Sequence, residues 1–162
     1  MFPGLVMNAE STYDSVAPAN SSNLRFQALM MFSSMMTNGK LHRFFNILKR
    51  KSSRLLERAA LKCAACASNR HYAGQMSVEI DRIRGSEGRT GDFDDAFFPL
   101  HDRMLSRWLG VASVRLAGEG LPPVELIQSG GVYFVRDGHH RISVAKALGE
   151  KYIDAEVVSE EC

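Results

Sequence analysis

Five consecutive residues at positions 137–141, with the sequence Asp-Gly-His-His-Arg, combine side chains suited to binding an anion. An apolar run typical of a strand precedes them and a run typical of a helix follows, so the motif stands at a predicted helix start. The first N–H groups of a helix and the positive end of its dipole attract anions. Gly138 permits a sharp turn there, and His139, His140 and Arg141 supply further hydrogen-bond donors. The motif therefore predicts a phosphate-binding site.

Arg141 is the most informative member, because it heads a helix face that is otherwise apolar and should point inward. A guanidinium in that place needs a partner, and a phosphate or carboxylate can bind it through two hydrogen bonds. We expect ligand binding to depend most on Arg141, and we expect the Asp137 carboxylate to cap the helix. The alternative is structural: a capped helix with an internal Arg–Asp pair and two surface histidines.

A loop at residues 85–99 is rich in glycine and carboxylates and also contains Arg89. Its carboxylates are Glu87, Asp92, Asp94 and Asp95. They could provide metal ligands or a general base, or they could simply cap turns. His139 could act as a general acid or base, or only donate a hydrogen bond to phosphate. His139 and Glu87 are the candidate catalytic residues, and we predict no dedicated metal cluster.

Three cysteines occur, at positions 63, 66 and 162. This odd number argues against a disulfide framework. Cys63 and Cys66 form one C-x-x-C pair, and zinc would need two further ligands that His71 alone does not supply. Their alanine-rich surroundings favour two small residues on a helix.

Charge is distributed unevenly along the chain. Residues 40–62 hold eight Lys/Arg against one Glu, whereas residues 77–162 hold ten Lys/Arg against fifteen Asp/Glu. Within the basic segment an apolar stripe with helical spacing is formed by Leu41, Phe44, Phe45 and Leu48. It predicts an amphipathic helix docked on the main domain by this stripe. Contact with nucleic acid, or with an anionic membrane surface, is the alternative.

The chain divides into three predicted parts. Residues 1–22 are a disordered leader, residues 23–70 a basic helical segment, and residues 72–160 an α+β domain. In the segment 24–67 we expect helices that break at Asn38–Gly39 and restart after Ser52–Ser53. No run is long enough to span a membrane, and the expected compartment is the cytoplasm.

Within the third part the clearest signal is a β-hairpin. Two β-rich runs, 124–127 and 132–135, flank Gly130–Gly131, which supplies the positive φ angles of a tight turn. A helix over 138–148 and a strand over 151–158 should follow. We expect residues 75–158 to form a small mixed sheet that contains the hairpin, with the 138–148 helix packed against it.

The run 121–158, "LPPVELIQSGGVYFVRDGHHRISVAKALGEKYIDAEVV", resembles the ParB/sulfiredoxin-like domain family, in particular bacterial ParB-like proteins with a basic helical N-terminus. Upstream, "VEIDRIRGSEGR" (78–89) resembles the first strand and phosphate-contacting loop of that family. The resemblance covers roughly residues 72–160. It implies a small α+β domain with a mixed sheet that binds a nucleoside di- or triphosphate, often with Mg²⁺. It also implies that Gly138 to Arg141 hold the phosphates and that Arg89 reaches in from the loop.

Departures from the family pattern restrict what the resemblance implies. His139 stands where sulfiredoxins have a catalytic cysteine, so sulfinic acid reduction is not expected. Partition proteins have Glu-Arg-Arg at residues 139–141 and continue into a helix-turn-helix, so neither CTP specificity nor that DNA reader is expected here. The leading hypothesis is a nucleotide-binding ParB-like protein, regulatory or DNA-associated through residues 40–62. The alternative is a small ParB-like kinase or phosphohydrolase that uses the 137–141 site.

Overall fold

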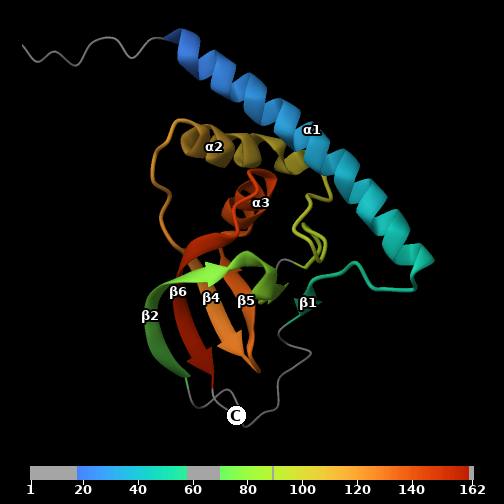
Figure 1. Ribbon diagram of the computed structural model, residues 1–162, viewed down its shortest axis with the longest axis vertical. Helices are drawn as coiled ribbons and strands as arrows, with labels where there is room; N and C mark the ends of the chain where they lie inside the picture. Colours follow the sequence, from blue (N-terminus) through green and yellow to red (C-terminus); the bar gives the residue numbers. More distant parts are fainter. Residues whose placement is uncertain (1–17, 58–69, 89, 161–162) are drawn as a thin grey trace, which may run out of the picture.

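The computed structural model describes residues 18–57, 70–88 and 90–160, and shows a mixed β-sheet with helices packed above one end of it (Figure 1). The helices are α1 (Pro18–Leu48), α2 (Leu105–Leu116) and α3 (His139–Ala147), with short 3-10 turns at Ile80–Arg82 and Asp102–Met104. The strands are β1 (Leu56–Glu57), β2 (Arg70–Glu79), β3 (Ile83–Ser86), β4 (Val124–Ser129), β5 (Val132–Asp137) and β6 (Tyr152–Glu160). The α+β class, with a mixed sheet, packed helices and a helical N-terminal segment, is confirmed.

The sheet has the order β1-β3-β5-β4-β6-β2. β4 and β5 form the predicted hairpin, and both turn glycines have positive φ angles, +60° at Gly130 and +80° at Gly131. β6 pairs parallel to β4 and antiparallel to β2, whereas β3 pairs parallel to β5. The motif at 137–141 therefore leaves the sheet from a central strand.

α2 and α3 pack on each other through a buried tryptophan. The Trp108 indole is fully buried, and its Nε1–H donates to Ser143 Oγ of α3 over 3.0 Å. An indole N–H that leaves water needs such an acceptor, so this bond fixes the two helices in register. The motif-bearing helix is thus held from above by α2 and from below by the sheet (Figure 1).

α1 docks on α2 through a face that the sequence interpretation did not choose. Ala28, Phe32 and Met35 are buried, and the Phe32 ring meets Trp108 edge-on at 5.5 Å. The expected aromatic stripe of Leu41, Phe44, Phe45 and Leu48 is instead exposed to solvent. The prediction that this stripe docks the helix is therefore wrong.

The expected helix break at Asn38–Gly39 is also wrong, because α1 runs through it without interruption. Gly39 is buried, and an added Cβ there would lie 2.8 Å from Cβ of Phe98. This glycine allows the helix to approach the 93–98 loop closely. The helix ends instead after Leu48, where Arg50 adopts a φ of +53° and Lys51 N–H donates to Asn46 O over 2.8 Å.

Other element boundaries also differ from those predicted. Residues 18–22 of the expected leader belong to α1, and residues 51–57 are extended, with β1 pairing parallel to β3. Residues 1–17 and 58–69, with Cys63 and Cys66, lie outside the described residues, as does Cys162. Among the described helices, none is long and apolar enough to cross a membrane.

Candidate functional site

The site is centred on the turn between β5 and α3. Gly138 is the N-cap of α3, with a φ of +103° that disfavours any residue with a side chain. An added Cβ would lie 2.5 Å from Cγ1 of Val124. The predicted sharp turn is confirmed, and the group that comes close to this glycine is Val124 of the neighbouring strand β4.

Arg141 joins three parts of the site. Its NH1 donates to the carbonyl oxygens of Pro122 and Pro123, and its NH2 donates to Asp137 Oδ2, each over 2.6 Å. The guanidinium side chain is only 14% exposed, whereas that of Asp137 is 60% exposed. The internal Arg–Asp pair of the structural alternative is therefore present. A guanidinium has five N–H donors, so two remain beyond these three bonds.

Asp137 does not cap the helix, contrary to expectation. α3 begins without any side-chain cap, and the carboxylate pairs with Arg141 one turn later. The reason is the positive φ of Gly138, which makes the glycine itself the N-cap and places Asp137 one residue too early to cap the first turn.

The two histidines pack against one aromatic ring. His139 is only 5% exposed, and its ring stacks on Phe93 with centroids 5.9 Å apart. Its Nε2 lies 2.7 Å from Oγ of the buried Ser86. His140 meets the same Phe93 ring edge-on at 5.3 Å. His139 is therefore part of the packing between α3, β3 and the 85–99 loop, rather than a surface residue.

A cavity of about 260 Å³ opens at the start of α3. Its lining residues are Arg107, Val111, Leu121, Pro122 and all five residues of the 137–141 motif. Arg107 comes from α2 and was missed by the sequence analysis. Across the described part of the chain, its guanidinium makes neither an ion pair nor a hydrogen bond. Its place off the apolar stripe of α2 was the available signal, but the sequence did not show that α2 lies over the motif.

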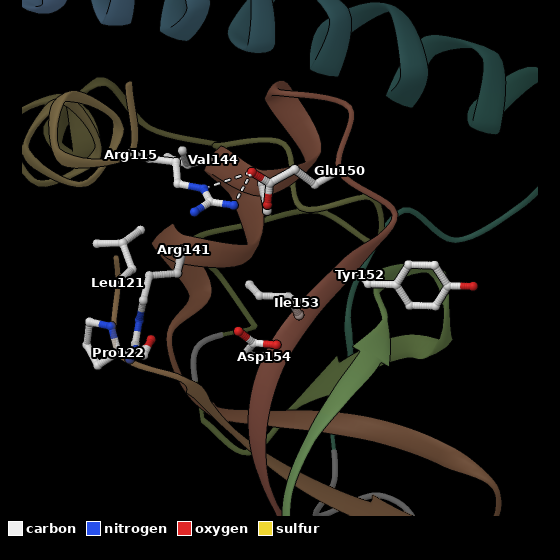
Figure 2. Close-up of a pocket in the computed structure, with 10 residues that line it drawn as sticks. Arg115, Leu121, Pro122, Arg141, Val144, Glu150, Tyr152, Ile153 and Asp154 are labelled. Carbon is white, nitrogen blue, oxygen red and sulfur yellow. Dashed lines mark hydrogen bonds and ion pairs between the residues drawn. The ribbon is translucent and has the colours of Figure 1, made fainter. Parts of the chain in front are cut away.

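Figure 2 shows a second cavity, of about 220 Å³. It adjoins the first, because Leu121, Pro122 and Arg141 line both. Arg115 and Glu150 meet at its edge, with Nε to Oε1 at 2.8 Å. Asp154 of β6 lines the same space. The two cavities together form one surface that begins at the helix start and carries both apolar and charged side chains.

The loop carboxylates do not gather in this cavity. Glu87 Oε2 lies 3.9 Å from Arg136 Nε, and Asp92 Oδ1 accepts from Arg103 over 2.8 Å. Among the described residues, neither Glu87 nor Asp92 lines the cavity at the start of α3. Arg89 lies outside the described residues. His139 thus lines the cavity, whereas Glu87 does not.

Asp94 fastens α1 to the loop. Its buried carboxylate accepts the N–H groups of Ala96 and Phe98 at Oδ1, over 3.0 and 2.9 Å. Its Oδ2 lies 3.4 Å from both His42 Nδ1 and Arg43 NH1 of α1. Burial raises the pKa of Asp94, because an ionised carboxylate loses solvation there, and the two N–H donors oppose this only in part.

His42, Asp94 and Asp95 bring their ligand atoms within 4.8 Å of one another, the spacing of a possible metal site. The Arg43 guanidinium already supplies positive charge to Asp94. His42 Nδ1 and Asp94 Oδ2 also lie 3.4 Å from each other and so already interact directly. We therefore interpret these contacts as ion pairs that hold α1 against the 85–99 loop.

No family model matches the chain, and no curated protein matches it either. Among solved structures, sulfiredoxin from Arabidopsis thaliana is similar, with a TM-score of 0.36 and 20% sequence identity over 51% of this chain and 82% of that one. A likeness of this size concerns part of the architecture and assigns no activity.

Proposed function

We propose that the cavity at the start of α3 binds the phosphate groups of a nucleoside di- or triphosphate. The observation that carries the proposal is Arg107, a cation without a described partner at a cavity lined by the whole 137–141 motif. The helix begins without a side-chain cap, and its dipole favours an anion at that end. A phosphate group would therefore meet the α3 dipole on one side and Arg107 on the other.

The presence of two adjoining cavities supports a nucleotide as the ligand. Ligand pockets commonly enclose about 300–1,000 Å³, and the first cavity alone is smaller than that. It suits phosphates, and the adjoining cavity with Asp154 and Arg115 offers room and hydrogen-bonding groups for the nucleoside. Asp137 is the carboxylate in the described lining of the first cavity. Mg²⁺ commonly binds one or two carboxylates together with substrate phosphates, so Asp137 would hold it with the ligand.

Phosphoryl transfer with His139 and Glu87 as catalytic residues has less support. His139 Nε2 is engaged by Ser86, and Glu87 is directed to Arg136 rather than to the cavity. A kinase or phosphohydrolase needs a base beside the transferred group. Binding is therefore the better-supported function, and catalysis is the second candidate.

The test is calorimetric titration of the full chain with ATP, ADP, CTP and GTP in the presence of Mg²⁺. Arg107→Gln should weaken binding about ten- to a hundredfold, the effect of losing a charge-assisted hydrogen bond. Arg84→Gln is the matched control, because Arg84 is an exposed cation on β3 outside the lining of both cavities. Absence of binding for all four nucleotides, or equal binding by Arg107→Gln, would reject the proposal. Release of phosphate in the same samples would favour the enzyme.

A further inference from the structure

The outer face of α1 carries large apolar side chains that no described residue covers. The segment that ends the helix exposes Leu41, Phe44, Phe45, Ile47 and Leu48. The exposed fractions reach 57% for Phe44 and 72% for Ile47. Figure 1 shows this end of α1 running beyond α2. Apolar patches of this kind on a surface commonly mark an interaction site.

Helical spacing separates this face from the docked one. Phe26, Met30, Leu41, Phe44 and Leu48 recur at intervals that keep them on one side of the helix. The buried residues of α1, which are Ala28, Phe32, Met35, Gly39 and Asn46, follow the same period on the opposite side. α1 can therefore remain docked on α2 while its outer face meets a partner.

The charge of α1 and of the segment that follows it restricts the partner. Residues 18–56 contain seven Lys/Arg and no Asp or Glu. Lys40, Lys49, Arg50 and Lys51 are exposed beside the apolar side chains. None of these four forms an ion pair with any residue that the structure describes. A partner must thus offer negative charge together with an apolar interior.

We propose that the outer face of α1 docks on an anionic membrane surface. An interfacial helix buries its apolar face about 5–10 Å into the headgroup boundary, while flanking Lys and Arg side chains reach the anionic headgroups. Nucleic acid would satisfy the charges but would leave Leu41, Ile47 and Leu48 without a use. A second copy of the chain would satisfy the apolar groups but would bring two copies of the cationic 40–51 segment together.

The test is co-sedimentation of the full chain with phosphatidylcholine vesicles, with and without phosphatidylglycerol. The parent should bind the anionic vesicles and be released by salt. Lys40→Gln with Lys49→Gln should weaken binding about 25-fold, at about fivefold for each charge. Phe44→Gln with Leu48→Gln should weaken it at least about tenfold. Tyr72→Gln, at an equally exposed position on β2, should bind like the parent.

All variants are checked by circular dichroism, and the exposed positions chosen should leave the fold intact. Absence of binding to anionic vesicles at low salt would overturn the proposal. So would equal binding by the Phe44/Leu48 variant, which would indicate adsorption by charge alone. Duplex DNA binding that needs only the lysines, without vesicle binding, would assign the face to nucleic acid. Dimerisation lost in the Phe44/Leu48 variant, again without vesicle binding, would assign it to a second copy.

Discussion

Arg141→Lys and Arg107→Lys should separate a structural arginine from a ligand-binding one. Both substitutions keep the positive charge and remove the planar guanidinium fork. Arg141 makes three internal hydrogen bonds of 2.6 Å, and a lysine cannot span all three acceptors. Arg107 makes no hydrogen bond or ion pair with the described residues, so its replacement removes none of these.

The expected loss of stability follows from those contacts. Two charge-assisted bonds to the Pro122 and Pro123 carbonyls dominate, because the Asp137 carboxylate is 60% exposed and its ion pair is screened. Loss of most of this set should lower the free energy of unfolding by about 2–3 kcal/mol in Arg141→Lys. Arg107→Lys should stay within about 0.5 kcal/mol of the parent.

Urea unfolding followed by Trp108 fluorescence measures both variants. With a typical urea dependence, Arg141→Lys should unfold at a midpoint about 1 M lower than the parent, and Arg107→Lys at the parent midpoint. Nucleotide titration of the same samples should then show weaker binding in both. Equal midpoints for the two variants would refute the conclusion that Arg141 holds the 121–123 segment against the start of α3.

Three further predictions concern the frame of the site. Gly149→Ala should lower the free energy of unfolding by about 1 kcal/mol, because only the φ of +74° is unfavourable for alanine. Gly138→Ala should lower it by about 3 kcal/mol or more, because the added Cβ also clashes with Val124, and equal losses would contradict this. Ser143→Ala should cost about 1–3 kcal/mol in urea unfolding by leaving the Trp108 N–H without an acceptor, and an unchanged midpoint would show the bond to be dispensable. Because burial in the folded state raises the pKa of Asp94 above its ordinary value, the contribution of this carboxyl to stability is present at low pH and is lost as the pH rises through the folded-state pKa. The stability of the parent relative to Asp94→Asn should therefore fall as the pH rises through the folded-state pKa of Asp94, and a difference that stays constant with pH would contradict the assignment.

Sequence patterns between near neighbours predicted the hairpin, helix and last strand that surround the 137–141 motif. The hairpin required two glycines with positive φ, and Gly130–Gly131 supplied them at the observed turn. The last strand alternates as expected, with Ala155 and Val157 buried and Asp154 and Glu156 exposed. These features depend on neighbours in the sequence, which is why periodicity and turn chemistry were sufficient.

The failures depended on tertiary contacts. The Asn38–Gly39 pair predicts a helix break, but Gly39 instead allows α1 to pack closely on Phe98. The stripe at Phe44 looked like a docking face because helical periodicity cannot tell which of two apolar faces meets the domain. The same limit applied to Arg107, which is brought to the motif only by the packing of α2 on α3.

Residue-level mapping of the ligand site tests the central claim most directly. In ¹H–¹⁵N spectra of the labelled chain titrated with ADP and Mg²⁺, the amides of residues 138–141 and the Arg107 side-chain Nε–H should shift together and saturate together. Pyrophosphate should reproduce the shifts at the α3 start, because phosphate groups bind there. Shifts confined to other surfaces, or an Arg107 signal that does not move while the protein binds ADP, would contradict phosphate binding at the start of α3.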